Sequence, residues 1–188
     1  MPHIDPRVNE IYLALGEFVM KFAEVENQLR IVCFDLLGAN SSGANVIAHE
    51  MGVMACNKFI RRVHKWNGEI LTERADLTLK HLELLLEERN NIFHNGIIET
   101  KDGFVCRKFL TMPLAQKYKE TLVTVTDFSC MIHDLEVILR SLSVLRFEFP
   151  PSVIPASGPL LDRDFLKAFQ LPLPPPWLRK PTPTAERM

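Results

Sequence analysis

The sequence predicts an all-α protein, an up-and-down bundle of four to five helices with a small inserted β-hairpin and a proline-rich C-terminal tail. Three observations favour this fold. Long stretches carry apolar residues at the three- and four-residue spacing of amphipathic helices. A short stretch after residue 96 changes to a pattern typical of strands. Ten of the thirteen prolines lie at or beyond Pro150, which indicates a tail rather than a second domain.

The composition is that of a soluble globular protein. The 188 residues are 47% hydrophobic and 24% charged, which suits one domain with a substantial core. Twenty-two Lys and Arg against 23 Asp and Glu argue against a dedicated nucleic-acid coat, but not against a small basic site. Because no apolar run reaches the roughly 18–20 residues of a membrane span and no secretory signal is visible, we expect cytoplasmic residence without membrane association.

The first helix is predicted over residues 7–37. Asp5 followed by Pro6 is a typical helix start, and Gly38 is a typical stop. Glu26 falls at the centre of the apolar stripe of this helix, so we expect its carboxylate to face the core. The stripe consists of Val8, Leu15, Val19, Phe22, Leu29, Cys33 and Leu37.

The next segment combines a loop with a second helical region. Residues 38–45 have the composition of a loop, and helical spacing follows over residues 45–66, with Gly52 as a candidate break. Asn67–Gly68 is expected to end this region. A cluster of basic residues is interpreted as a solvated helix face, and the alternative is a surface for a phosphate backbone. The cluster consists of Lys58, Arg61, Arg62 and Lys65.

The most informative helix is predicted over residues 77–96, opened by Thr72 or Asp76. Arg89 falls near the middle of its apolar arc, where a guanidinium is costly unless it is paired. We therefore expect Arg89 to form an ion pair with Glu26 of the first helix. The arc covers about half of the circumference and consists of Leu77, Leu82, Leu85, Leu86, Ile92 and Phe93.

The end of this helix supplies the candidate site. Asn90 and His94 are four residues apart, so they share a face at the polar edge of the arc, and Asn95 follows directly. Polar groups therefore gather at a helix end next to a core-directed arginine. The predicted site residues are Arg89, Asn90, His94 and Asn95, with Glu26 in support.

The pattern of the chain changes after the helix. Residues 97–109 read as a β-hairpin that turns at residues 101–103. Residues 113–125 are ambiguous between strand, helix and loop. The cap of the last helix is expected at Thr124 or Thr126.

The last helix closes the domain and the tail follows. The helix runs to about Arg146, so the chain divides into a helical-bundle domain, residues 1–149, and a proline-rich tail, residues 150–188. Residues 160–169 have an amphipathic pattern suited to docking on the bundle or on a partner. Residues 172–177, PLPPPW, are interpreted as a linker or a strap, and the alternative is a ligand for a proline-binding groove. The apolar face of the helix consists of Phe128, Met131, Ile132, Leu135, Ile138, Leu139 and Leu142.

Metal binding finds little support in the sequence. The six histidines include no His-x3-His pair, and the four cysteines include no CxxC pair. We expect no cofactor and no metal. Cys33, Cys56, Cys106 and Cys130 are interpreted as buried free thiols. The histidines interpreted as surface or helix-face residues are His49, His64, His81 and His133.

The stretch EERNNIFHNG, residues 87–96, resembles the Arg-x4–6-His motif of HEPN domains, including the polar residue that often follows the arginine. The predicted layout over residues 7–147 is also similar, with a long first helix that contains a glutamate, then the motif helix and a closing helix. The resemblance implies a HEPN-like bundle that acts as a metal-independent endoribonuclease. It also implies a homodimer, in which two copies of the motif line one cleft.

Each site residue has a role that this resemblance implies. His94 acts as general base or acid while the ribose 2′-hydroxyl attacks the neighbouring phosphate, which yields a 2′,3′-cyclic phosphate. Arg89, oriented by Glu26, stabilises the charge on the phosphorane oxygens. Asn90 and Asn95 hold a phosphate or a ribose hydroxyl. The biological setting implied is a toxin or a phage-defence protein, with RNA as substrate and an antitoxin or regulatory protein as partner.

Two other classes of function are open at this point. The first is a catalytically inactive HEPN-like module that dimerises or binds RNA or a nucleotide. The second is a DNA-binding helical regulator, but no helix-turn-helix spacing stands out and the chain is nearly neutral.

Overall fold

The structure, a computed structural model, describes residues 5–37, 42–66, 73–109, 118–148, 175, 177 and 178. In this part of the chain it contains five helices and one three-stranded antiparallel sheet. The prediction of a mainly helical fold is therefore confirmed. The expected helix signals at Gly38, Asn67–Gly68 and Thr72, and the amphipathic segment 160–169, lie outside the described residues.

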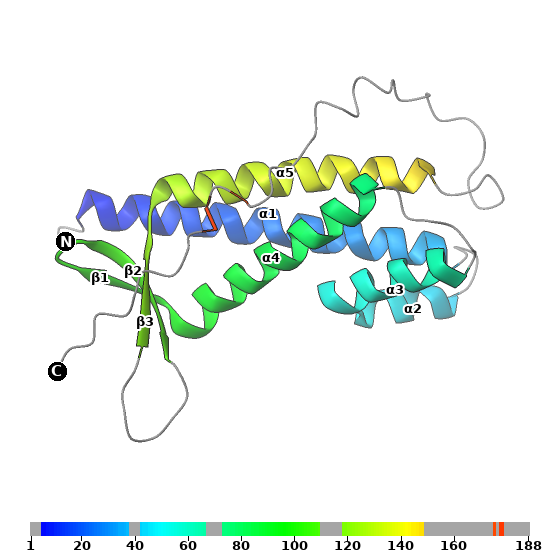
Figure 1. Ribbon diagram of the computed structural model, residues 1–188, viewed down its shortest axis with the longest axis horizontal. Coiled ribbons are helices and arrows are strands. Elements are labelled where there is room, and N and C mark those ends of the chain that lie inside the picture. Colours follow the sequence, from blue (N-terminus) through cyan, green and yellow to red (C-terminus); the bar gives the residue numbers. More distant parts are fainter. Residues whose placement is uncertain are drawn as a thin grey trace.

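Two long helices lie side by side along the molecule, and a third crosses them obliquely (Figure 1). The helices are α1 (Pro6–Leu36), α2 (Ser42–Glu50), α3 (Val53–Trp66), α4 (Glu73–Asn95) and α5 (Val125–Glu148). α1 and α5 form the long pair, α4 crosses them, and α2 and α3 pack near the end of α1. The rings of Phe18 on α1 and Phe128 on α5 are buried between the long helices, with their centroids 5.8 Å apart. None of the described helices combines the length and hydropathy that a membrane span requires.

Local signals set most helix boundaries. The side chain of Asp5 accepts a hydrogen bond from the backbone N–H of Arg7 at 2.9 Å, so Asp5 caps α1 as predicted. Thr124 caps α5, because its hydroxyl oxygen accepts a hydrogen bond from the backbone N–H of Asp127 at 3.1 Å. In return, the backbone N–H of Thr124 donates to the side-chain carboxylate of Asp127. Gly52 separates α2 from α3, also as predicted. α2 begins at Ser42, so the prediction of a loop to residue 45 is wrong there.

The sheet follows α4 and contains one strand more than the predicted hairpin. The strands are β1 (Ile97–Thr100), β2 (Gly103–Phe109) and β3 (Tyr118–Val123), in that order across the sheet. Thr100 pairs with Gly103, so the hairpin is confirmed. β3 pairs with β2 from within the segment that was ambiguous in sequence. Gly96 has a φ of 71°, the left-handed conformation that favours glycine, and it turns the chain from α4 directly into β1.

One piece of the proline-rich tail packs into the bundle. The side chain of Trp177 is only 6% exposed, and its indole N–H donates a hydrogen bond to Oδ2 of Asp134 on α5 at 2.6 Å. Nε2 of His81 on α4 lies 2.9 Å from the same oxygen, and His81 is fully buried. His81 was expected on the surface or on a helix face; the surface alternative is wrong, because His81 lies on a buried face of α4. Of the segment interpreted as a linker or a strap, the structure thus places Trp177 against the bundle.

All four cysteines are free thiols, as predicted. Cys33, Cys56 and Cys106 are buried, and Cys130 is partly buried. A hydrogen bond with Cys56, together with burial, raises the pKa of the Cys33 thiol well above its usual value. Cys33 therefore stays protonated and acts as an apolar core residue.

Candidate functional site

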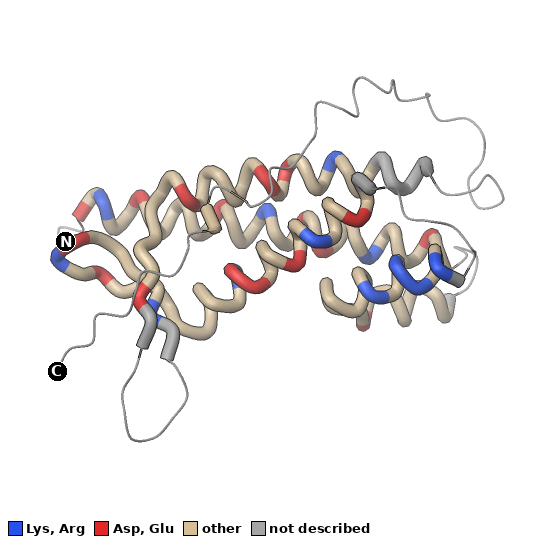
Figure 2. Tube along the Cα trace, in the orientation of Figure 1, with Lys and Arg blue, Asp and Glu red and all other residues tan. Residues whose placement is uncertain are grey.

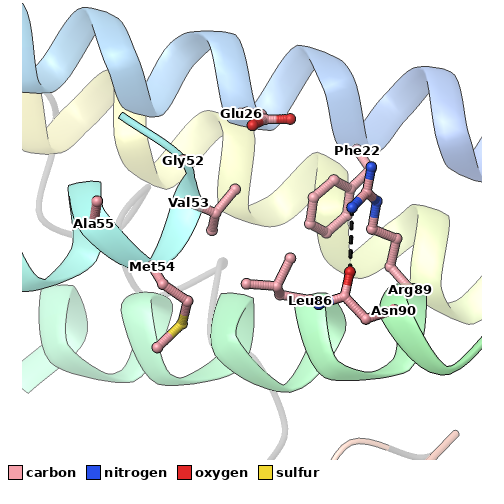
Figure 3. A pocket seen from close by; sticks show the side chains of 9 residues that line it. All are labelled: Phe22, Glu26, Gly52, Val53, Met54, Ala55, Leu86, Arg89 and Asn90. Atoms are coloured by element: carbon pink, nitrogen blue, oxygen red, sulfur yellow. Dashed lines mark hydrogen bonds between the residues drawn. The ribbon is translucent and has the colours of Figure 1, made fainter. Parts of the chain in front are cut away.

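A pocket between α1, the start of α3 and α4 brings together three of the predicted site residues. These are Arg89 and Asn90 on α4 and Glu26 on α1 (Figure 3). The pocket has a volume of about 290 Å³, and its remaining lining residues are Phe22, Gly52, Val53, Met54, Ala55 and Leu86. The fold thus joins residues from three helices that are far apart in sequence.

Arg89 is held at this pocket by aromatic rings. Its guanidinium carbon lies 5.4 Å from the ring centroid of Phe22 on α1 and 5.0 Å from that of Phe93, one turn later on α4. Both distances are within the range of a cation–π contact. Nη1 of Arg89 also donates a hydrogen bond to Oδ1 of Asn90 at 3.2 Å. Across the described ranges, Arg89 forms no ion pair with a carboxylate, so its charge is available to an anion in the pocket.

The predicted ion pair between Glu26 and Arg89 is not formed. Oε1 of Glu26 lies 3.0 Å from Nη2 of Arg30, one turn later on α1. Nε of Arg30 donates in addition to the backbone carbonyl of Met51 at 3.1 Å. The prediction assumed that Arg89 points into the core, but Arg89 lies partly exposed at the core's edge, where rings and solvent replace a counter-ion. Glu26 still lines the pocket, with its charge compensated by Arg30.

His94 and Asn95 lie at the end of α4, and neither lines the pocket. The side chain of His94 is exposed and follows Asn90 by one turn, so the two share a face of the helix. Asn95 turns back onto its own helix, because its side-chain nitrogen donates to the carbonyl of Asn91 at 2.7 Å. The side-chain nitrogen of Asn95 is therefore engaged within α4.

The start of α3 adds positive potential to the pocket. Gly52, Val53, Met54 and Ala55 form this end of the helix, where the first backbone N–H groups have no intrahelical acceptor. The helix dipole is also positive there. With the guanidinium of Arg89 on the facing wall (Figure 3), the pocket suits an anionic group such as a phosphate better than a cation.

Sequence reasoning missed part of this environment, although some signals were present. The spacing predicts Phe93 on the apolar arc, but Phe93 is 51% exposed and its ring contacts the guanidinium of Arg89. Residues four apart on a helix are neighbours, so the spacing of Arg89 and Phe93 already permits this contact. The same spacing joins Glu26 to Arg30. The contribution of Phe22 depends on how α1 and α4 cross, which no local pattern reveals.

The part of the chain that the structure describes contains no group of three or more His, Cys, Asp or Glu side chains placed to hold a metal ion. Comparisons with protein-family models, with curated proteins and with solved structures find no match to this chain. The function is therefore inferred from the residues of the chain itself, above all from Arg89 and His94.

Proposed function

We propose that this protein is a metal-independent endoribonuclease of the HEPN type that works as a homodimer. The observation that carries the proposal is the environment of the Arg89 guanidinium. Its guanidinium is held by two rings at a pocket, without an ion pair to any described carboxylate, and close to the exposed His94 in sequence. An arginine retained only for packing is expected to have a counter-ion in the core. Both groups of the Arg-x4-His motif are instead accessible to a substrate.

RNA cleavage by this route needs no external nucleophile. A base removes the proton of the ribose 2′-hydroxyl, and the oxygen attacks the adjacent phosphorus. The bond from phosphorus to the 5′-oxygen of the next nucleotide breaks, and an acid protonates that oxygen. The products are a 2′,3′-cyclic phosphate and a 5′-hydroxyl. An imidazole suits both proton transfers near neutral pH, and a guanidinium stabilises the charge on the phosphorane.

The proposal assigns these tasks to named residues. His94 transfers the protons, and Arg89 binds the scissile phosphate. Asn90 accepts a hydrogen bond from Arg89, which orients the guanidinium and leaves the Asn90 side-chain amide nitrogen for a phosphate or ribose hydroxyl. Asn95 uses its side-chain nitrogen within the helix, so only its side-chain oxygen is offered to a ribose hydroxyl. Glu26 shapes the pocket wall.

A second subunit completes the site in this proposal. His94 does not line the pocket of its own chain, and two motif helices facing each other would bring two imidazoles and two guanidiniums into one cleft. Two exposed apolar side chains suit such an interface, that of Met54, which lines the pocket, and that of Phe93, which contacts Arg89. A toxin or phage-defence setting, with an antitoxin as partner, belongs to the same proposal and rests on the motif.

The decisive experiment incubates the purified protein with tRNA, rRNA and mRNA and analyses the fragment ends. We expect cyclic-phosphate ends from the wild type, and a fall in cleavage of at least roughly 100-fold in Arg89→Ala and in His94→Ala. His133→Ala is the matched control, because His133 is an exposed histidine on α5. Cleavage that survives unchanged in Arg89→Ala and His94→Ala would refute the assignment.

Two further conditions separate this mechanism from other nucleases. Cleavage is expected to persist in EDTA, and DNA of the same sequence is expected to resist cleavage because it lacks the 2′-hydroxyl. Loss of activity in EDTA that Mg²⁺ or Mn²⁺ restores would instead favour a metal-dependent nuclease.

A second candidate function is a catalytically inactive module that binds RNA or a nucleotide in the same pocket. The observation that favours it is the position of His94, outside the pocket that contains Arg89. Binding that Arg89→Ala abolishes, without any cleavage by the wild type, would support this module over the enzyme.

A further inference from the structure

α3 differs in charge from the other described helices. Its 14 residues include no Asp or Glu. In contrast, α1, α2, α4 and α5 each contain more carboxylates than lysines and arginines. In a chain with a net charge of −1, positive charge is therefore concentrated on one helix, as Figure 2 shows. The cations of α3 are Lys58, Arg61, Arg62 and Lys65.

One of these cations is neutralised within the fold. Arg61 forms an ion pair with Asp76 on α4, and its Nη2 lies 3.7 Å from Oε1 of Glu83. The other three cations are exposed, and none forms an ion pair within the residues described here. We name these three, Lys58, Arg62 and Lys65, the basic stripe.

The basic stripe starts at the pocket. At 100° per residue its three positions lie within about 60° of one another around α3. Met54, which lines the pocket, lies on the same side of the helix. With a rise of 1.5 Å per residue, the stripe positions are about 6, 12 and 17 Å from Met54 along the axis. A row of cations thus leads away from the pocket that contains Arg89.

We infer that the basic stripe binds the phosphate backbone of the RNA strand whose scissile phosphate occupies the pocket. The inference rests on the proposed ribonuclease function. The stripe is about 10 Å long, which matches about three steps between successive phosphates at the roughly 3.4 Å rise of one stacked strand. Contacts to phosphates carry no sequence information, so this surface sets the affinity and position of the RNA rather than the choice of sequence.

The test measures binding in the His94→Ala background, where cleavage does not interfere. The variant carries Lys58→Gln, Arg62→Gln and Lys65→Gln. The probe is a fluorescein-labelled single-stranded oligoribonucleotide of about 12 nucleotides, long enough to cover the pocket and the stripe. Three lost phosphate contacts should reduce the slope of log K against log salt by about 2. The same loss corresponds to a rise in Kd of roughly tenfold to fiftyfold near physiological salt.

The matched control removes three exposed cations from other elements, with the same change in net charge. It carries Arg7→Gln, Lys80→Gln and Lys101→Gln, and its slope and Kd are expected to stay near those of the parent. Because the stripe side chains are exposed and form no ion pair with a described residue, the melting temperature of the stripe variant should change little. The control variant also loses the ion pairs of Arg7 with Asp5 and of Lys80 with Asp76, so its melting temperature should fall modestly. Lys58→Gln alone should reduce the slope by about 0.7.

Several outcomes would overturn the inference. One is a stripe variant that binds RNA as tightly as the control variant, with the same salt slope. Another is binding of poly-glutamate with the same affinity and the same dependence on the stripe, since the surface would then accept any polyanion.

The experiments distinguish a failure of the ribonuclease proposal from a failure of the inference about the basic stripe. If the wild type cleaves no RNA but the slope changes as expected, the ribonuclease proposal falls and the RNA-binding surface stands. If the wild type cleaves RNA but the slope does not change, the enzyme stands and the surface falls.

Discussion

The guanidinium carbon of Arg89 lies 5.4 Å from the ring centroid of Phe22, and this contact replaces the ion pair with Glu26 that the sequence predicts. Phe22 is buried while Arg89 is partly exposed, so the cation lies at the boundary between core and pocket. A planar guanidinium can lie over a ring and still direct its N–H groups at acceptors beyond the ring edge. α1 thereby fixes the position of a charge that α4 carries.

The second ring on Arg89 gives a test of this arrangement. Phe93→Leu keeps an apolar side chain but removes the aromatic face. Because an exposed cation–π contact is worth about 0.5–1 kcal/mol, we expect RNA cleavage to fall by roughly twofold to fivefold. Since Phe93 is largely exposed, the free energy of unfolding should stay within about 0.5 kcal/mol of wild type. Cleavage assays and urea unfolding measure the two effects.

Tyr12→Leu is the control for Phe93→Leu, since Tyr12 is an exposed aromatic residue on α1 outside the pocket. It should cleave RNA at the wild-type rate. If Phe93→Leu and Tyr12→Leu behave alike, Phe93 has no part in positioning Arg89.

Glu26 pairs with Arg30 instead of Arg89, and this changes the loss of stability expected when Glu26 is replaced. A pair buried in the core would cost several kcal/mol to break. In the structure, the side chains of Glu26 and Arg30 are 26% and 31% exposed, so solvent screens the pair. Glu26→Gln should therefore lower the free energy of unfolding by about 1 kcal/mol or less, measured by urea denaturation. A loss of about 3 kcal/mol would instead indicate a buried partner.

Much of the fold could be predicted because its signals are local. The cap at Asp5, the break at Gly52 and the hairpin at residues 97–109 depend on residues only a few positions apart. β3 was not predicted because apolar and polar residues do not alternate regularly in its sequence, YKETLV. Its conformation depends on its pairing with β2. The start of α2 at Ser42 was not predicted, because the serine and glycine residues at this end of the helix are typical of a loop.

The sequence predicted several of the residues that line the pocket, but not the contacts that they form. Helical spacing placed Glu26 and Arg89 on faces that meet, and both line one pocket. Which acceptor a side chain reaches depends on distances of a few ångströms, and periodicity does not fix these. The contact between His81 and Trp177 illustrates the same limit, since only the packed structure brings tail and α4 together.

A pH dependence is expected at the contact between α3 and α4. A hydrogen bond from Lys80, together with the charge of Arg61, holds the pKa of Asp76 below its ordinary value of 3.8. A lowered carboxyl pKa stabilises the fold above the ordinary value, and the stabilisation is lost as pH falls through the folded-state pKa. At neutral pH, Asp76→Asn should therefore be less stable than wild type by about 1 kcal/mol.

The stability difference between wild type and Asp76→Asn should shrink as pH falls below 3.8, because the wild-type carboxyl then becomes neutral as well. Urea unfolding of both proteins across a pH series measures it. A difference that stays constant down to the lowest pH at which both proteins fold would show that the charge of Asp76 does not contribute.

The anchoring of the tail by Trp177 predicts the largest loss of stability. Trp177→Ala removes a buried ring and the indole N–H that donates to Asp134, so the free energy of unfolding should fall by about 3 kcal/mol. Trp177→Phe retains a ring but loses the hydrogen bond, and should cost about 1–2 kcal/mol. Leu178→Ala, at an exposed neighbouring residue, should cost less than about 0.5 kcal/mol. If urea denaturation gives Trp177→Ala the same stability as Leu178→Ala, the indole does not hold the tail against α4 and α5.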